Sequence, residues 1–371
     1  MFKRVFKYLL VAVLFILTSC TKENMDDCFA NLKLKFTFIL HTNDGDNRFG
    51  PDVQLVRVYF FDENGVLAHI QQEQGVALTN DYAMDVQIAP GKYTIIAWGG
   101  SNEDFTNSFH EGHMNDAQNH SYENGVTIGK TTLDDFRIFL NYGIADNFPE
   151  DIIPTIEEFD DLYYGAAGTR QSGTSKYIFE KVEVRAGVAN EKLIELIRNT
   201  NILKVTVTGL EYLQHYNNAF RSVVNAPTSR VSGSDVLLVW ASARNGRYKY
   251  DNTIGEYSRM MRYHPVYRSL DANTMVVDIK TMRLDMDKHK AEPVYLTIQN
   301  PVTGVTFPSK PIDVVNTLLQ AKDPKTGEYI YQTQEDFDKI YEHPIDVEIT
   351  ADLHVKIFVQ GWEIIMLYPE I

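Results

Sequence analysis

The residue with the most informative chemical setting in this chain is Cys20, because a thiol can be acylated and the preceding residues favour that reaction. Residues 1–7 carry three positive charges and no acid, and residues 8–17 form an apolar run. That run is shorter than the roughly 20 apolar residues of a membrane-spanning helix, and the pattern is typical of a secretory signal peptide. The cut site, Leu17-Thr18-Ser19-Cys20, resembles a lipobox. We therefore predict a signal peptide over residues 1–19 and lipidation of Cys20. An ordinary signal peptide with a chance cysteine is the alternative, which the scarcity of cysteine disfavours.

Three histidines are the next candidates for chemistry. His110, His113 and His120 have a crude metal-ligand spacing, but the favoured interpretation is a polar loop rich in Asn and His. Residues 43–47 (Asn-Asp-Gly-Asp-Asn) could offer oxygen atoms to calcium. They lack the ordered acids and the terminal Glu of an EF-hand loop, so a turn is expected. The sequence thus predicts no metal site.

Catalytic motifs are not found. The chain has no Gly-rich phosphate loop, no Gly-x-Ser-x-Gly elbow and no His-Glu-x-x-His. Carboxylates are numerous, but no spacing singles out a glycosidase pair. Its 21 tyrosines could stack on glycans, although aromatic residues in sandwiches mostly fill cores and cross-strand pairs. We expect neither an enzyme nor a cofactor, and no small-molecule substrate.

Composition narrows the class further. Removal of residues 1–19 leaves 352 of the 371 residues, and these contain 32 Lys and Arg and 50 Asp and Glu. A net charge of −18 excludes nucleic-acid binding through bulk electrostatics and favours solubility outside the cell. Lipidation of Cys20 would leave Cys28 as the only free cysteine, so stability must come from buried apolar area rather than a disulfide. Residues 21–28 are polar and acidic, which suits a flexible tether or a surface-export signal.

Period-two alternation of apolar and polar residues dominates the mature chain and predicts half-buried strands. The strands expected in the first half cover residues 32–40, 53–61, 82–88 and 92–98, with an Asn-Gly hairpin turn at 62–65. In the second half they cover 203–207, 236–240, 275–279, 295–298, 345–349, 355–359 and 362–366. Frequent strands separated by turns favour an all-β sandwich over a parallel α/β sheet.

The remaining segments are assigned from composition. Residues 99–130 are expected to form a long polar loop, or a short helix set in loops. Residues 333–341 predict a short capped helix, and residues 191–198 fit a helix or a strand. Residues 165–176 are the most linker-like stretch. We therefore expect a tether over 20–31, an N-terminal sandwich over 32–168 and a C-terminal sandwich over 169–371.

The order of several motifs resembles that of one known family. After the lipobox come Leu-Lys-Leu-Lys-Phe at 32–36, Val-Tyr-Phe-Phe-Asp-Glu-Asn-Gly at 58–65, Ala-Pro-Gly-Lys-Tyr-Thr-Ile-Ile-Ala-Trp-Gly-Gly at 89–100 and Val-Lys-Ile-Phe-Val-Gln-Gly-Trp at 355–362. This pattern is similar to the FimB-like family of Bacteroidetes fimbrial anchor lipoproteins (type V pili), over almost the whole chain. The resemblance implies two tandem transthyretin-like (Greek-key) β-sandwich domains and a role at the base of a fimbrium.

Subunits of such pili join by strand donation, in which an extended segment of one subunit adds to the sheet of the next. A donor must be extended, alternately apolar and close to a chain end. Trp362, Ile364 and Met366 meet these conditions and form our candidate donor strand. For the isolated monomer, the favoured alternative is that they form the last strand of their own domain.

Arg48 is the candidate processing site. In shaft subunits of these pili, a protease that cuts after arginine removes the first strand, whereas an anchor cut there would lose its lipid. Residues 21–47 contain no arginine, which suits an anchor, but Arg48 follows the first predicted strand. A shaft or tip fimbrillin processed after Arg48 therefore remains an alternative.

The function that the resemblance implies is a lipid-anchored subunit that attaches a pilus to the outer membrane and limits its length. Its expected partners are fimbrial shaft subunits and, through acyl chains, the outer membrane at the cell surface. A cell-surface glycan-binding lipoprotein is the other alternative.

Overall fold

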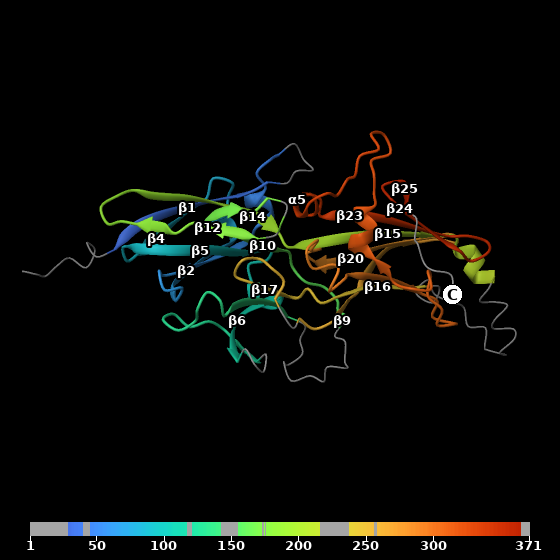
Figure 1. Ribbon diagram of the computed structural model, residues 1–371, viewed down its shortest axis with the longest axis horizontal. Coiled ribbons are helices and arrows are strands. Elements are labelled where there is room, and N and C mark those ends of the chain that lie inside the picture. The colour runs from blue at the N-terminus through green and yellow to red at the C-terminus, as the bar shows by residue number, and fades with distance from the viewer. Residues whose placement is uncertain are drawn as a thin grey trace, which may run out of the picture.

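The chain folds almost entirely into strands. The computed structural model describes residues 29–39, 45–116, 121–141, 155–172, 174, 176–215, 237–255 and 258–364. Two β-sandwich assemblies lie end to end along the long axis of the molecule (Figure 1). This confirms the all-β sandwich class expected from the alternation and the two tandem sandwiches that the family resemblance implies. The predicted signal peptide, Cys20, Cys28, His120 and Met366 lie outside the described residues.

The first assembly is built around an eight-stranded sheet. Its path runs β3-β2-β5-β10-β14-β1-β4, and β13 also pairs with β5. The strands are β1 (Ala30–Phe38), β2 (Leu55–Phe61), β3 (Leu67–Gln74), β4 (Ala83–Ile88), β5 (Gly91–Gly100), β10 (Leu162–Ala166), β13 (Val182–Val184) and β14 (Asn190–Arg198).

This sheet curls so that β1, β4 and β14 face β2 and β5 across one apolar core. The side chains of β1 alternate between that core and solvent, as predicted, with Leu34 and Phe36 buried and Lys33 and Lys35 exposed. β2 is buried on both faces, which its continuous apolar sequence predicts. The turn at 62–65 is also confirmed, because it joins β2 to β3 as an antiparallel hairpin.

A four-stranded sheet covers the other face of β2 and β5. Its order is β17-β8-β6-β7, with β6 (Phe109–Asp116), β7 (Ser121–Asn124), β8 (Phe136–Leu140) and β17 (Arg247–Lys249). The prediction of a polar loop over 99–130 is therefore wrong in its central part. The strands β6 and β7 contain several Gly, Asn, Asp and His residues. They therefore lack the apolar alternation that identifies the other strands in the sequence. A small ribbon of β11 (Gly168–Arg170) and β12 (Tyr177–Phe179) lies beside the first assembly.

The second assembly packs a six-stranded sheet on a five-stranded one. The six-stranded sheet has the order β19-β20-β15-β23-β24-β25, and the five-stranded sheet has the order β22-β21-β16-β18-β9. The first contains β15 (Thr200–Thr208), β19 (Pro265–Leu270), β20 (Thr274–Met282), β23 (Glu342–Ile349), β24 (Val355–Val359) and β25 (Trp362–Ile364). The second contains β9 (Thr155–Ile156), β16 (Leu238–Ala243), β18 (Met261–Tyr263), β21 (Tyr295–Gln299) and β22 (Ile312–Asp313).

Helices are short. The α-helices that lie wholly within the described residues are α2 (Phe49–Asp52), α4 (Val314–Leu319) and α5 (Gln334–Lys339), and the 3-10 turns among these residues are η2 (Gly75–Ala77) and η3 (Phe105–Asn107). Residues 210–215 are also helical. The helix expected over 333–341 is confirmed as α5. Thr333 and Asp336 form its capping box, in which the Thr333 backbone N–H donates to Asp336 Oδ2 at 2.8 Å.

The two assemblies are interlocked along the chain. Residues 191–198, which fitted a helix or a strand, lie in β14, and β14 pairs with β1 and β10. The boundary expected at residue 169 therefore falls inside the first sheet, which continues to Arg198. In addition, β9 of the first half pairs with β18, and β17 of the second half pairs with β8. This exchange explains why one apolar core runs continuously between the assemblies.

Candidate assembly surfaces

The first strand is a structural element of the first sandwich rather than a peripheral arm. β1 pairs in parallel with β14 from Leu32↔Asn190 to Phe38↔Leu196, and antiparallel with β4 on its other edge. Four large apolar side chains of β1 are at most 4% exposed. At roughly 1.5–3 kcal/mol per fully buried side chain, their burial is worth about 6–12 kcal/mol. That is similar to the whole net stability of a typical domain, about 5–15 kcal/mol. Removal of β1 would therefore leave a deep groove and a badly destabilised sandwich.

The candidate processing site follows directly after this strand and is fastened to it. The backbone N–H of Arg48 donates to the Phe38 carbonyl at 2.7 Å. Its guanidinium forms two hydrogen bonds to Asp52, Nη2 to Oδ1 at 2.7 Å and Nε to Oδ2 at 3.2 Å. The next residue, Phe49, is fully buried and stacks on Phe36 with ring centroids 5.4 Å apart.

The local hydrogen bonds of this segment come from a short Asn-rich turn. Asn47 Oδ1 accepts from the backbone N–H of Phe38 at 3.0 Å and from that of Phe49 at 3.1 Å. The turn expected from residues 43–47 is thus present in its described part. It orients the start of α2, so the peptide bond after Arg48 lies at a helix entry and not in an extended loop.

The candidate donor strand forms the outer edge of the second assembly. Within the described part of the chain, β25 pairs only with β24, from Val359↔Trp362 to Ile357↔Ile364. The two residues between these strands, Gln360 and Gly361, both have positive φ, 50° and 81°. That combination is the signature of a type I′ hairpin turn. In this structure Trp362 and Ile364 therefore complete their own domain, and Ile364 is only 4% exposed.

A neighbouring hairpin contacts this edge strand. Lys322 and Tyr329 face each other across an isolated bridge. The Lys322 ammonium lies 4.6 Å from the centroid of the Tyr329 ring and 5.6 Å from that of Trp362. Two cation–π contacts at a half-exposed site contribute about 0.5–1 kcal/mol each. Among the described residues β25 is paired along one edge, whereas β1 is paired along both, so β25 is the easier strand to displace.

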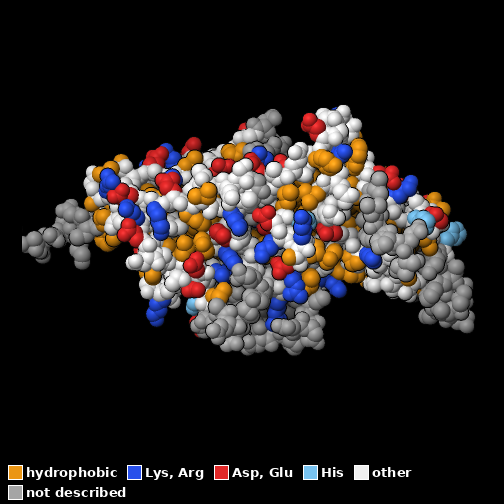
Figure 2. Space-filling view, in the orientation of Figure 1, with side chains coloured by type: hydrophobic (Ala, Val, Ile, Leu, Met, Phe, Trp, Pro, Cys, Tyr) orange, Lys and Arg blue, Asp and Glu red, His pale blue; other side chains and the backbone are white. Residues whose placement is uncertain are grey.

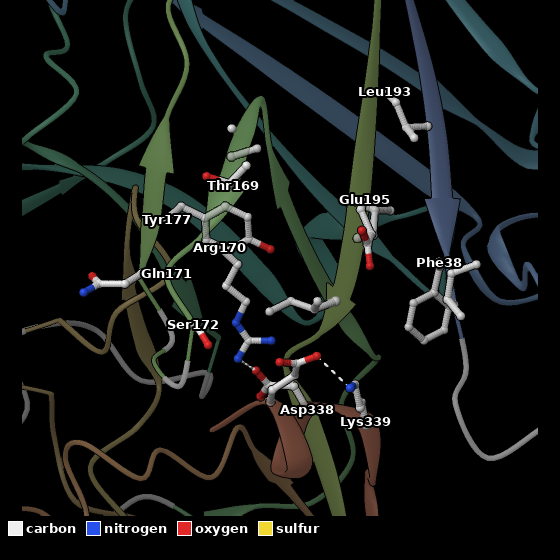
Figure 3. Close-up of a pocket in the computed structure, with 16 residues that line it drawn as sticks. Phe38, Thr169, Arg170, Gln171, Ser172, Tyr177, Leu193, Glu195, Asp338 and Lys339 are labelled. Carbon is white, nitrogen blue, oxygen red and sulfur yellow. Dashed lines mark hydrogen bonds and ion pairs between the residues drawn. The ribbon is translucent and has the colours of Figure 1, made fainter. Parts of the chain in front are cut away.

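A pocket of about 470 Å³ marks the junction of the assemblies, close to where β1 ends (Figure 3). Arg170 of β11 reaches across it and pairs with Asp338 of α5. Lys339 beside it pairs with Glu335 at 2.6 Å. Because both cations already have carboxylate partners, the pocket offers little to an anionic ligand.

The ion pair at this junction continues into the protein interior. Asp338 is 2% exposed, and its Oδ1 lies 3.9 Å from Nε of Arg283, which is 1% exposed. Arg283 also pairs with Asp285 at 3.2 Å. Burial disfavours the charged guanidinium, yet Asp338 and Asp285 raise the pKa of Arg283 above its usual value. Sequence reasoning missed this network because its members are up to 168 positions apart and follow no motif.

A second, partly buried carboxylate links the sheets. Asp161 Oδ1 accepts from Arg198 at 2.8 Å and from the Thr200 hydroxyl at 2.8 Å, and it lies 2.6 Å from Lys280 Nζ. Burial opposes ionisation, but the two cations hold the pKa of Asp161 below its usual value. These partners come from β14, β15 and β20, so the cluster fixes the crossing from one assembly to the next.

The two described histidines of the motif do not converge. His110 and His113 lie on β6, three residues apart, so their side chains leave opposite faces of the strand. The His110 ring stacks on Phe139, and His113 Nδ1 lies 2.9 Å from the Gly125 carbonyl. Within the described ranges, no group of three His, Cys, Asp or Glu is placed to hold a metal ion. Nor does any described helix have the length and apolar character needed to cross a membrane.

Several solved structures from Bacteroides and Porphyromonas species have a similar architecture. A candidate polysaccharide-binding protein from Bacteroides thetaiotaomicron matches with a TM-score of 0.64 at 21% identity, over 91% of this chain and 98% of the other. A candidate adhesin from Bacteroides ovatus matches with a TM-score of 0.63 at 18% identity, over 90% and 95%. The fimbrial anchor protein Mfa2 from Porphyromonas gingivalis matches with a TM-score of 0.59 at 16% identity, over 91% and 99%. At these identities the likeness establishes the fold.

The family follows from the sequence itself. The sequence model of the fimbrillin-A associated anchor proteins Mfa1 and Mfa2 matches residues 25–366. The chain belongs to this family, which confirms the resemblance to fimbrial anchor proteins. It is therefore a fimbrial protein of the cell surface, and its family is one of structural anchor proteins rather than enzymes. No curated protein matches the chain.

Proposed function

We propose that this protein is the lipid-anchored base subunit of a fimbrium. Acyl chains on Cys20 attach it to the outer membrane, and contacts with shaft subunits attach the pilus to it. The observation that best supports this proposal is that the residues on both sides of the Arg48–Phe49 peptide bond are held by the fold. The Arg48 side chain is paired with Asp52, and Phe49 is buried against Phe36.

A protease needs its cleavage segment extended and accessible. Here cleavage requires that α2 unfold and that Phe49 leave the core, at a cost of about 1.5–3 kcal/mol for that side chain alone. Without the cut, β1 stays covalently linked both to the lipidated end and to the sandwich. The groove that β1 fills then stays closed, so the subunit can donate a strand but not accept one. Growth of the pilus would end at such a subunit, which limits its length.

Lipidation and processing are tested on surface protein. Cells grown on labelled palmitate should label the wild-type protein but not a Cys20→Ser variant, and the wild-type N-terminus should be blocked. Recovery of a chain that begins at Phe49 would instead assign the protein to the shaft or tip.

With an arginine-specific protease, the folded protein should be cut at exposed Arg185 before Arg48. An Asp52→Ala variant, which removes both side-chain bonds to Arg48, should be cut there faster.

Strand donation is tested by locking β25. Phe358 and Glu363 are directly opposite each other on β24 and β25. In a two-residue hairpin this second pair is not hydrogen-bonded, and its Cα separation of about 4.5 Å suits a disulfide. A Phe358→Cys/Glu363→Cys variant in a Cys28→Ser background should lose shaft-protein binding when oxidised and regain it when reduced. Equal binding in both states would exclude β25 as the donor. Retention on a polysaccharide column without fimbrial protein would favour the glycan-binding alternative.

A further inference from the structure

Several loops meet where the described chain begins, and we call this surface the N-terminal tip. It comprises Phe29, the β2–β3 turn at 62–66, the β4–β5 turn at 89–92 and the β13–β14 segment at 181–189. The strand register places them together, because Ala30 pairs with Ile88 and Val184 pairs with Gly91. They form the left end of the molecule, where β1 starts (Figure 1).

The N-terminal tip exposes apolar side chains that the core does not need. Phe29 is 48% exposed and Val188 is 55% exposed. Ala89, Pro90 and Ala186 are exposed beside them. Apolar and charged groups are intermixed on this end in the space-filling view (Figure 2). Single exposed apolar residues are ordinary, but a set on several loops at one end is typical of an interaction site.

The charges of the N-terminal tip cancel, unlike those of the rest of the protein. Its four segments contain three acids (Asp62, Glu63, Glu183) and three bases (Lys92, Lys181, Arg185). Lys92 lies 3.6 Å from Glu63, and Arg185 lies 2.6 Å from Glu183. The mature chain as a whole carries a net charge of −18, so most of its surface is repelled by anionic lipid headgroups. The four segments of the tip add no net charge to that repulsion.

The distance from the N-terminal tip to the lipidation site limits which surfaces the tip can contact. Phe29 is nine residues after Cys20, and nine residues span at most about 30 Å when fully extended. If Cys20 carries acyl chains, the tip must lie within that distance of the bilayer. A second copy or a shaft subunit would have to fit into the same gap.

We propose that the N-terminal tip rests on the lipid bilayer, with Phe29 and Val188 inserted at the boundary of headgroups and acyl chains. This inference rests on the proposed lipidation of Cys20. Interfacial burial of exposed apolar side chains adds to the acyl anchor and gives the sandwich a fixed orientation. The tether then limits how far the protein can move, and the tip sets the direction in which β25 points away from the membrane.

The test uses full-length lipidated protein in vesicles of phosphatidylethanolamine and phosphatidylglycerol. An NBD fluorophore is attached at Val188→Cys in a Cys28→Ser background. The matched control is Val76→Cys, because Val76 is fully exposed but lies in η2, at the other end of β2 and β3. Val188 lies in the β13–β14 connection and Val76 in a single 3-10 turn, and both side chains are exposed, so neither label disturbs folding.

We expect the label at 188 to shift to the blue and to lose at least half of its emission when doxyl-labelled lipids are included. The label at 76 should do neither. Equal responses at both sites would refute the inference, and so would a blue shift at 188 without lipid quenching, because that result indicates a protein partner. Vesicle flotation is measured first: protein that fails to float overturns lipid anchoring itself, whereas floating protein without quenching overturns only the seated tip.

Discussion

The ion network at the junction of the assemblies gives the sharpest test of how the halves are coupled. Asp338 is the carboxylate shared by Arg170 of the first half and Arg283 of the second. An Asp338→Asn variant keeps the shape of this side chain and removes its charge. The side chain of Gln334, which donates to Asp338 Oδ1 at 2.9 Å, can still bond to the amide oxygen.

The expected loss in the free energy of unfolding depends on which partners each arginine keeps in the variant. Breaking a buried ion pair by removing one partner costs about 3–5 kcal/mol, because the remaining charge is left buried. Arg283 keeps Asp285 at 3.2 Å, and Arg170 keeps a bond from Nε to the Thr174 carbonyl at 2.9 Å. Arg170 is also partly exposed, so water can solvate it. We therefore expect a loss near the lower end of that range, about 3 kcal/mol.

Urea unfolding followed by tryptophan fluorescence measures this loss, and hydrogen exchange of residues 168–179 reports whether the β11–β12 ribbon loosens. The matched control is Glu335→Gln on the same helix. Glu335 forms a largely exposed i, i+4 ion pair with Lys339, which is worth about 0.3–0.5 kcal/mol. A loss below about 1 kcal/mol in Asp338→Asn, or an equal loss in Glu335→Gln, would refute the reasoning that buried charge couples the two assemblies.

Three further outcomes are expected. Phe36→Ala removes a ring buried against Phe49 and should lower the free energy of unfolding by about 3–5 kcal/mol; a Lys33→Ala control on the exposed face of β1 should change it by less than about 0.5 kcal/mol. Gly209→Ala should yield little folded protein on size-exclusion chromatography, because φ is +84° and a Cβ would lie 1.9 Å from the Ile349 carbonyl oxygen. Burial lowers the pKa of His343 to about 3, from an ordinary 6.5. Only the unfolded chain then binds this proton between those values, so stability should fall as the pH drops below 6.5, by about 2 kcal/mol at pH 5. His343→Gln should flatten this part of the pH profile, and an unchanged slope would assign it to other groups.

Much of the fold could be predicted because its signals are local. In β1, and in β15 from Leu203 to Val207, every second residue is apolar, and a pleated strand places those residues on one face. The Asn64-Gly65 turn and the Thr333/Asp336 capping box depend on residues within one turn of each other. The strands β6 and β7 were missed because tertiary pairing overrode their weak intrinsic preference.

The sequence by itself determined the alternation of strands and turns, the acidic charge, the family resemblance, and the residues at which lipidation, processing and strand donation are expected. The tertiary structure decided which residues are in contact. It buried Phe49 beside Arg48, set β25 at a sheet edge, exchanged β9 and β17 between the assemblies, and brought Arg170 to Asp338. Contacts of this kind join residues far apart in the chain, and their energy comes from desolvation and packing, which no local pattern of residues encodes.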